Sequence, residues 1–247
     1  MNSKSQIAPF LISFAIIFVL FRGIAILLAG ADWTVVMLLI CGVVVVGVTL
    51  AWSLIKKTPF AQSFRAIGFG VPDGRVLGIA IALSFLMVAF IPVYANIANA
   101  GIHLQGNWLW ILLGVITGVG ITEETLFRGF VFNFLRQDRT FWRAATLSMI
   151  VFGAMHLLLF FWLPIPVAIA AIILAILAAY PTAYLFEKGN NTIWPSAIMH
   201  FAALATNLFV IPIEITTTFS LIWIGVVVIF LFLVFAAGRV FLKNQQA

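Results

Sequence analysis

The chain has 247 residues, of which 64% are hydrophobic and only 8% are charged. A soluble globular domain is about 45–50% apolar and about 25% charged, so these figures exclude an ordinary soluble enzyme, and they also exclude a disordered chain and a disulfide scaffold. The net charge is +6, but the 13 basic residues are scattered along the chain. They fit the positive bias of cytoplasmic loops better than a nucleic-acid-binding face. The sequence therefore predicts an integral membrane protein that has the lipid bilayer as its surroundings and no nucleic-acid partner.

Apolar runs long enough to cross a bilayer follow one another along the chain. A spanning helix needs about 20 mostly apolar residues. The runs cover residues 8–30, 33–55, 76–98, 108–135, a stretch that follows Arg143 and ends near Trp162, 165–186, 193–211 and 219–238. Residues 29–31, at the end of the first run, match the small-residue cleavage site of a signal peptide. The length of the run and the charge of Arg22 within it nevertheless favour a helix that is not cleaved off. The predicted fold class is all-α: a polytopic membrane protein with about eight transmembrane helices, forming a single integral membrane domain over residues 1–247.

The basic residues predict the orientation of these helices. If the N-terminus is cytoplasmic, eleven Lys and Arg residues lie in segments on the inside and none lies in a segment on the outside, which is the pattern of the positive-inside rule. Arg22 and Arg128 are left within the membrane. We therefore expect a multi-pass protein of the cell membrane with both termini in the cytoplasm. The inside set is Lys4, Lys56, Lys57, Arg65, Arg75, Arg136, Arg139, Arg143, Lys188, Arg239 and Lys243.

The connections between the helices are short, so no separate domain outside the membrane is expected. The longest connection lies between Lys56 and Arg75, and it carries aromatic residues near helical spacing at 60–69. This pattern predicts either a short helix in the membrane interface or a plain loop. The lone cysteine, Cys41, lies in an apolar run and excludes an intramolecular disulfide.

Polar side chains cluster in the interior of three predicted helices. A charged residue at the centre of a span costs about 2.5–3.5 kcal/mol on insertion scales, so each one is a candidate site residue. The polar set consists of Glu123, Glu124 and Arg128 on the fourth helix, His156 on the fifth, and His200 and Asn207 on the seventh.

Spacing assigns the residues of the fourth helix to faces. Glu124 and Arg128 are four residues apart and can pair on one side, whereas Glu123 points about 100° away and is free to face another helix. The ion pair either holds the bundle together or takes part directly in chemistry. Gly114 and Gly118 form a small-xxx-small pair that allows a neighbouring helix to approach closely.

The polar set suits the hydrolysis of an amide bond by either of two routes. In the first, Glu123 acts as a base toward water with a histidine as its partner, and the second imidazole and the carboxamide stabilise the oxyanion. In the second, Glu123, His156 and His200 bind a zinc ion that activates the water. Other intramembrane hydrolases are not indicated, because the sequence lacks H-E-x-x-H and G-x-S-x-G, and its aspartates lie near or beyond helix ends.

These residues resemble the motifs of a known family. Glu123-Glu124-x-x-x-Arg128, Phe152-x-x-x-His156 and the later His200 resemble those of the CPBP intramembrane proteases. This is the group of CAAX-processing and bacteriocin self-immunity (Abi) proteins, which includes the Rce1-type CAAX prenyl endopeptidases. The motif-bearing core would cover residues 108–211.

The resemblance implies a role for each motif residue. Glu123 would activate water with His156 as its partner, Glu124 and Arg128 would complete the first motif, and His200 would help to hold the oxyanion. The family usually shows H-x-x-x-N, but position 204 is a leucine. Asn207, seven residues after His200 and about 10 Å along the axis, is the candidate that remains for the second oxyanion donor.

The function expected from the resemblance is an intramembrane endopeptidase of the glutamate or metallo type, acting on a membrane-anchored peptide or protein and cutting near a C-terminus. Zinc would be its cofactor only on the second route. The family also contains members that imply an alternative, a non-proteolytic immunity factor or a scaffold that binds a partner. A transporter that relays protons through Glu123 and Glu124 is a third hypothesis, although no inverted repeat supports it.

Overall fold

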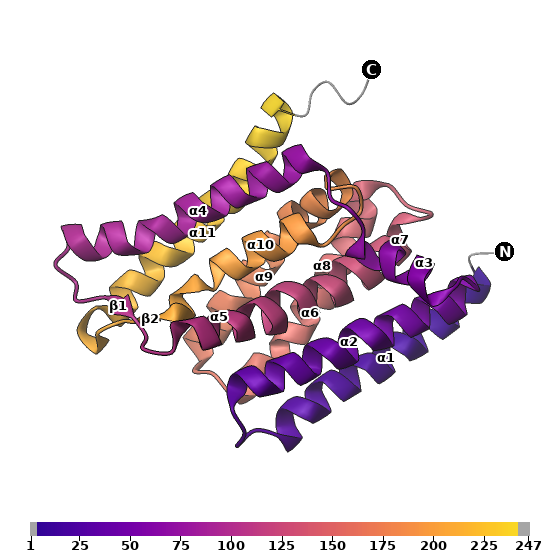
Figure 1. The fold of residues 1–247 in the computed structure, drawn as a ribbon, viewed down its shortest axis with the longest axis horizontal. Coiled ribbons are helices and arrows are strands. Elements are labelled where there is room, and N and C mark those ends of the chain that lie inside the picture. Colours follow the sequence, from indigo (N-terminus) through magenta and orange to yellow (C-terminus); the bar gives the residue numbers. More distant parts are fainter. Residues whose placement is uncertain (1–3, 242–247) are drawn as a thin grey trace.

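A computed structural model describes residues 4–241 of the chain as a bundle of helices that run roughly alongside one another (Figure 1). Within these residues, seven helices are long and apolar enough to cross a membrane. The predicted all-α, polytopic membrane fold is therefore confirmed. Lys243, one of the basic residues used to predict the orientation, lies outside the described residues.

The helices follow the predicted order with small shifts at their ends. The N-terminal part contains α1 (Lys4–Leu27), α2 (Trp33–Lys56), α3 (Phe60–Phe64), a π-helical turn (Arg65–Phe69), α4 (Gly74–Ile97) and β1 (His103–Leu104). The motif-bearing span contains α5 (Trp108–Val115), a π-helical segment (Ile116–Ile121), α6 (Thr122–Glu124), a second π-helical segment (Thr125–Phe132) and α7 (Asn133–Arg136). The remainder contains α8 (Phe141–His156), a 3₁₀ turn (Leu157–Phe161), α9 (Ile165–Lys188), α10 (Trp194–Ala203), a 3₁₀ turn (Ala205–Leu208), β2 (Phe209–Val210) and α11 (Ile213–Phe241).

The motif-bearing span lies at the centre of the bundle. In the most apolar 18-residue stretch of this span, half of the residues are buried inside the protein, compared with 11% in the corresponding stretch of α1. Gly114 and Gly118 face α2, as the small-xxx-small pair predicts: a Cβ atom added at Gly114 would lie 2.5 Å from the Trp33 ring, and one added at Gly118 would lie 2.4 Å from Met37 Sδ. The two glycines thus allow α2 to pack directly against the span that carries the glutamates.

The segment predicted at residues 193–211 is a shorter helix than the sequence indicated. The helix α10 ends at Ala203, and a 3₁₀ turn and β2 complete the crossing toward the far end of the bundle (Figure 1). Trp223 Nε1 donates a hydrogen bond of 2.9 Å to the carbonyl of Ala203, which satisfies this terminal group from α11. Non-helical backbone is tolerated at membrane depth only where protein or a cavity surrounds it. Ala205 and Leu208 in the turn are accordingly buried.

The connection between α2 and α4 joins the motif-bearing span to the start of α10. Residues 60–69 form α3 and a π-helical turn in which Ile67 is fully buried. The carbonyl of Ala66 accepts a hydrogen bond of 2.7 Å from Asn133 Nδ2, and the carbonyl of Gly68 accepts one of 3.0 Å from the N–H of Ile193. Gly68 has φ +110°, and a Cβ atom there would meet Ile193 at 2.6 Å. The segment thus ties the motif-bearing span to the start of α10.

Candidate active site

The first motif lies where the helical backbone of its span widens. Glu123 and Glu124 lie in the short helix α6, between two π-helical segments. π-Helical geometry is rare and is found frequently at functional sites. The two π-helical segments depart from the regular α-helical hydrogen-bond pattern on either side of the glutamates, which is consistent with a functional site here.

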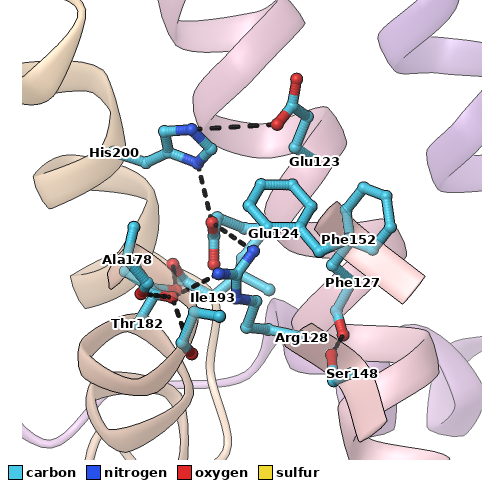
Figure 2. A network of polar contacts seen from close by, with 12 residues as sticks. Glu123, Glu124, Phe127, Arg128, Ser148, Phe152, Ala178, Thr182, Ile193 and His200 are labelled. Carbon is cyan, nitrogen blue, oxygen red and sulfur yellow. Dashed lines mark hydrogen bonds and ion pairs between the residues drawn. The ribbon is translucent and has the colours of Figure 1, made fainter. Parts of the chain in front are cut away.

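The ion pair predicted within the first motif is present and fully buried. Arg128 Nη1 lies 3.2 Å from Glu124 Oε1, and the two side chains are 2% and 0% exposed. Arg128 Nη2 also donates a short hydrogen bond to Thr182 Oγ1, and that hydroxyl donates to the carbonyl of Ala178 at 2.7 Å. The guanidinium is therefore held between the motif-bearing span and α9 (Figure 2).

His200 connects the two glutamates. Its Nδ1 atom donates a hydrogen bond of 2.8 Å to Glu124 Oε1, and its Nε2 atom lies 3.8 Å from Glu123 Oε2 (Figure 2). The spacing in the sequence left Glu123 free to face a different neighbour from Glu124. In the structure both carboxylates face the same imidazole, one at each ring nitrogen. His200 is thereby fixed on one side by a buried carboxylate and left with one nitrogen directed at Glu123.

Phe152 and His156 form the second motif and pack against the first. The Phe152 ring lies under the Arg128 guanidinium, with Cζ 4.6 Å from the ring centroid, and it meets the His156 ring edge to face at 4.5 Å. His156 Nδ1 lies 2.8 Å from the carbonyl oxygen of Phe152. Because a carbonyl only accepts, Nδ1 carries the proton of this contact, so that Nε2 of the neutral ring keeps its lone pair.

Two cavities meet at Glu123 and His156. The larger has a volume of about 220 Å³ and is lined by Glu123, His156 and His200 together with apolar side chains of α9 and α11. The smaller has a volume of about 70 Å³, and Arg22 from α1 joins Glu123 and His156 in its wall. The structure thus brings three predicted site residues to one cavity. Glu123 Oε2 is buried and has no hydrogen-bond partner among the described residues, so its lone pairs are available to a ligand.

Asn207 lies away from this cavity. It is an exposed residue in the 3₁₀ turn that follows α10, and its Nδ2 atom donates a hydrogen bond of 2.8 Å to the carbonyl of Leu204. Leu204, at the position where the family pattern has asparagine, lines the larger cavity instead. Asn207 is therefore not placed to support an oxyanion beside His200.

The residues present do not fit a zinc site. In the part of the chain that the structure describes, no three His, Cys, Asp or Glu side chains are arranged to hold a metal ion. The set Glu123, His156 and His200 that the second route required lines one cavity, but these side chains are not grouped closely enough to hold a metal ion.

Two residues near the site were not predicted as part of it. Thr182 supports Arg128, but a threonine in an apolar helix gives no signal in the sequence. Arg22 was noted only as a charge left within the membrane. The rule that an ionisable residue inside a span is a candidate site residue would have included it.

Comparison with known protein families supports the resemblance read from the motifs. Residues 105–209, less than half of the chain, match the family model for Rce1-like proteins, described as type II CAAX prenyl endopeptidase Rce1-like. No curated protein matches the chain. The matched residues contain all three motifs. The motif-bearing part of this multi-pass membrane protein is therefore similar to the Rce1-like family of intramembrane CAAX proteases, as its motifs predict.

Proposed function

We propose that this protein is an intramembrane endopeptidase that hydrolyses peptide bonds of membrane-anchored substrates near their C-terminus, with Glu123 as the base that activates water. The observation that supports this most strongly is the shared cavity: Glu123, His156 and His200 come from three different elements and line one space inside the bundle. A purely structural polar cluster needs no such space. The similarity to CAAX proteases supports the reaction class.

The first step is the activation of water between Glu123 and His156. The lone pair of His156 Nε2 accepts one hydrogen bond from the water molecule and orients it, while Glu123 Oε2 accepts the other. Glu123 takes a proton as the water oxygen attacks the carbonyl carbon of the scissile bond. The same proton is then delivered to the nitrogen of the leaving peptide as the C–N bond breaks, which restores the carboxylate.

In this proposal His200 stabilises the oxyanion formed in this step. Its Nδ1–H donates to Glu124, and a proton on Nε2 would face the cavity that Glu123 lines. The hydrogen bond to the buried Glu124 carboxylate fixes the orientation of the ring, as the aspartate of a Ser-His-Asp triad does. Arg128 in turn holds Glu124, so Glu124 and Arg128 are positioning residues for His200.

The larger cavity favours apolar residues in the substrate. Its wall beyond the three polar side chains includes Ala171, Leu174, Ala175 and Ala178 of α9 and Val227 and Leu231 of α11. An engineered apolar cavity of about 150 Å³ is enough to bind benzene. A cavity of about 220 Å³ therefore accommodates an apolar side chain of a peptide next to the scissile bond.

Cleavage of a lipid-anchored reporter peptide by the purified protein tests the proposal. We expect wild type to release the C-terminal fragment and His156→Ala to lower kcat by about 10²-fold, because the attacking water loses its orientation. His103→Ala is the matched control, since His103 is exposed in β1. Equal cleavage by wild type and His156→Ala would remove His156 from the mechanism. A wild type that cleaves no reporter would favour the non-proteolytic immunity or scaffold role.

Treatment with a chelator tests the choice between the two routes. Because no three His, Cys, Asp or Glu side chains of the described residues are grouped to hold a metal ion, we expect full cleavage activity after exhaustive dialysis against a chelator that binds zinc tightly. Fragment release before and after dialysis is the measurement. Loss of activity that zinc restores would show that the donors rearrange around a metal ion.

A further inference from the structure

Arg22 is a charged side chain in an apolar helix, and the carboxylate of Glu123 acts on it electrostatically without forming an ion pair. It lies inside the membrane-spanning helix α1, where a charge costs about 2.5–3.5 kcal/mol to insert. None of the ion pairs between described residues involves Arg22. Its Nε atom is buried and has no hydrogen-bond partner among the described residues. Arg128, the other arginine within the membrane, in contrast forms an ion pair with Glu124 and donates a hydrogen bond to Thr182.

The guanidinium is held in place by an aromatic ring. Its Cζ atom lies 4.5 Å from the ring centroid of Trp162, at the turn between α8 and α9. Stacking of this kind fixes the plane of the guanidinium and leaves its edge free to donate hydrogen bonds. Arg22 is thus oriented by the ring, while the carboxylate of Glu123 acts on it only across the small cavity that both residues line.

The side chain also lies next to the proposed catalytic groups. Arg22, Glu123 and His156 line the same small cavity of about 70 Å³. Glu123 and His156 also line the larger apolar cavity, so the reacting bond would have an apolar space on one side and a space that holds the Arg22 guanidinium on the other. The helix α1 lies outside the residues matched by the family model, which begin at 105.

We propose that Arg22 binds the free C-terminal carboxylate of the substrate peptide, an inference that rests on the proposed endopeptidase function. A C-a-a-X substrate has its C-terminus three residues beyond the modified cysteine, which places the carboxylate at most about 10 Å from the cut. A planar guanidinium matches a carboxylate with two parallel hydrogen bonds. Arg22 then acts as a specificity-determining residue: it selects peptides that end shortly after the scissile bond.

A pair of substrates that differ only at the C-terminus tests this inference. The probes are one lipid-anchored peptide with apolar C-terminal residues, ending either in a carboxylate or in a carboxamide. We expect wild type to show a KM about tenfold lower for the acid than for the amide, the loss expected for a hydrogen bond to a charged group. In Arg22→Gln, KM for the acid should rise to the value for the amide, with KM for the amide unchanged. Arg22→Lys should recover part of the preference for the acid. Arg239→Gln also removes one positive charge, but from an exposed position, and should retain the whole preference.

The outcomes separate this inference from the proposed function. Equal KM values for acid and amide in wild type would overturn the role of Arg22 while leaving the endopeptidase intact, and so would an acid preference that persists in Arg22→Gln. If neither peptide is cleaved, the proposed function fails. Direct binding of the two peptides to the purified protein then decides the role of Arg22: tighter binding of the acid that Arg22→Gln abolishes supports a carboxylate site, and equal binding refutes it. Trp162→Leu, which removes the stacking ring, should weaken the preference if Arg22→Gln does not fold.

Discussion

Glu123→Gln should abolish peptide cleavage while leaving the protein folded. The amide has nearly the shape of the carboxylate and remains able to accept a hydrogen bond from water, but it does not take up the proton. Loss of a general base lowers kcat by about 10²–10⁴-fold. Because Glu123 is 19% exposed and its one ion pair among the described residues is the 3.8 Å contact with His200, its replacement disturbs little of the packing. The measurements are kcat for the lipid-anchored reporter and the thermal unfolding midpoint in detergent.

The control for this variant is another glutamate of the same helical bundle. Glu214 lies in the first turn of α11 and is exposed, so Glu214→Gln should change neither kcat nor the unfolding midpoint. A Glu123→Gln protein that keeps more than half of the wild-type kcat would show that Glu123 is not the base. A large fall in the unfolding midpoint would show that Glu123, like its neighbour, has a structural role.

The sequence was sufficient to predict the membrane fold and the contact within the first motif. Runs of apolar residues define spans by length alone, and the four-residue spacing of Glu124 and Arg128 places them on one face of any helix. Both are local properties of the chain. The close approach of a neighbouring helix at Gly114 and Gly118 was predicted for the same reason, since a pair of small residues allows close packing, and the structure identifies this helix as α2.

These local patterns do not determine how the helices are placed relative to one another. Nothing in the spacing of Glu123 and Glu124 shows that both would face His200, because that depends on the depth and rotation of α10. The early end of α10 depends on Trp223, which lies 20 residues further along and donates to the carbonyl of Ala203. Arg22 approaches Glu123 only because α1 packs beside the motif-bearing span. Each of these features is set by tertiary packing.

Removing one partner of the buried ion pair should destabilise the protein strongly. Glu124→Met leaves the Arg128 guanidinium buried without a carboxylate, and Arg128→Met leaves the Glu124 carboxylate without its cation. Each should lower the free energy of unfolding by about 3–5 kcal/mol, the cost of an uncompensated buried charge. Arg136→Met is the matched control: it breaks the exposed pair of Arg136 with Glu187, whose side chains are 39% and 27% exposed, and should cost at most about 1 kcal/mol. Denaturant titration in detergent measures all three.

The double variant, Glu124→Met with Arg128→Met, distinguishes the structural role of the pair from its role in the site. Apolar side chains of similar size remove both buried charges at once, so the free energy of unfolding should recover most of what each single variant loses. Cleavage should not recover, because His200 Nδ1 then has no carboxylate to donate to and the imidazole ring loses the contact that orients it. A double variant that is both stable and fully active would show that the pair only holds the bundle together. A stable but inactive one would show that the same carboxylate fastens the helices and orients the histidine.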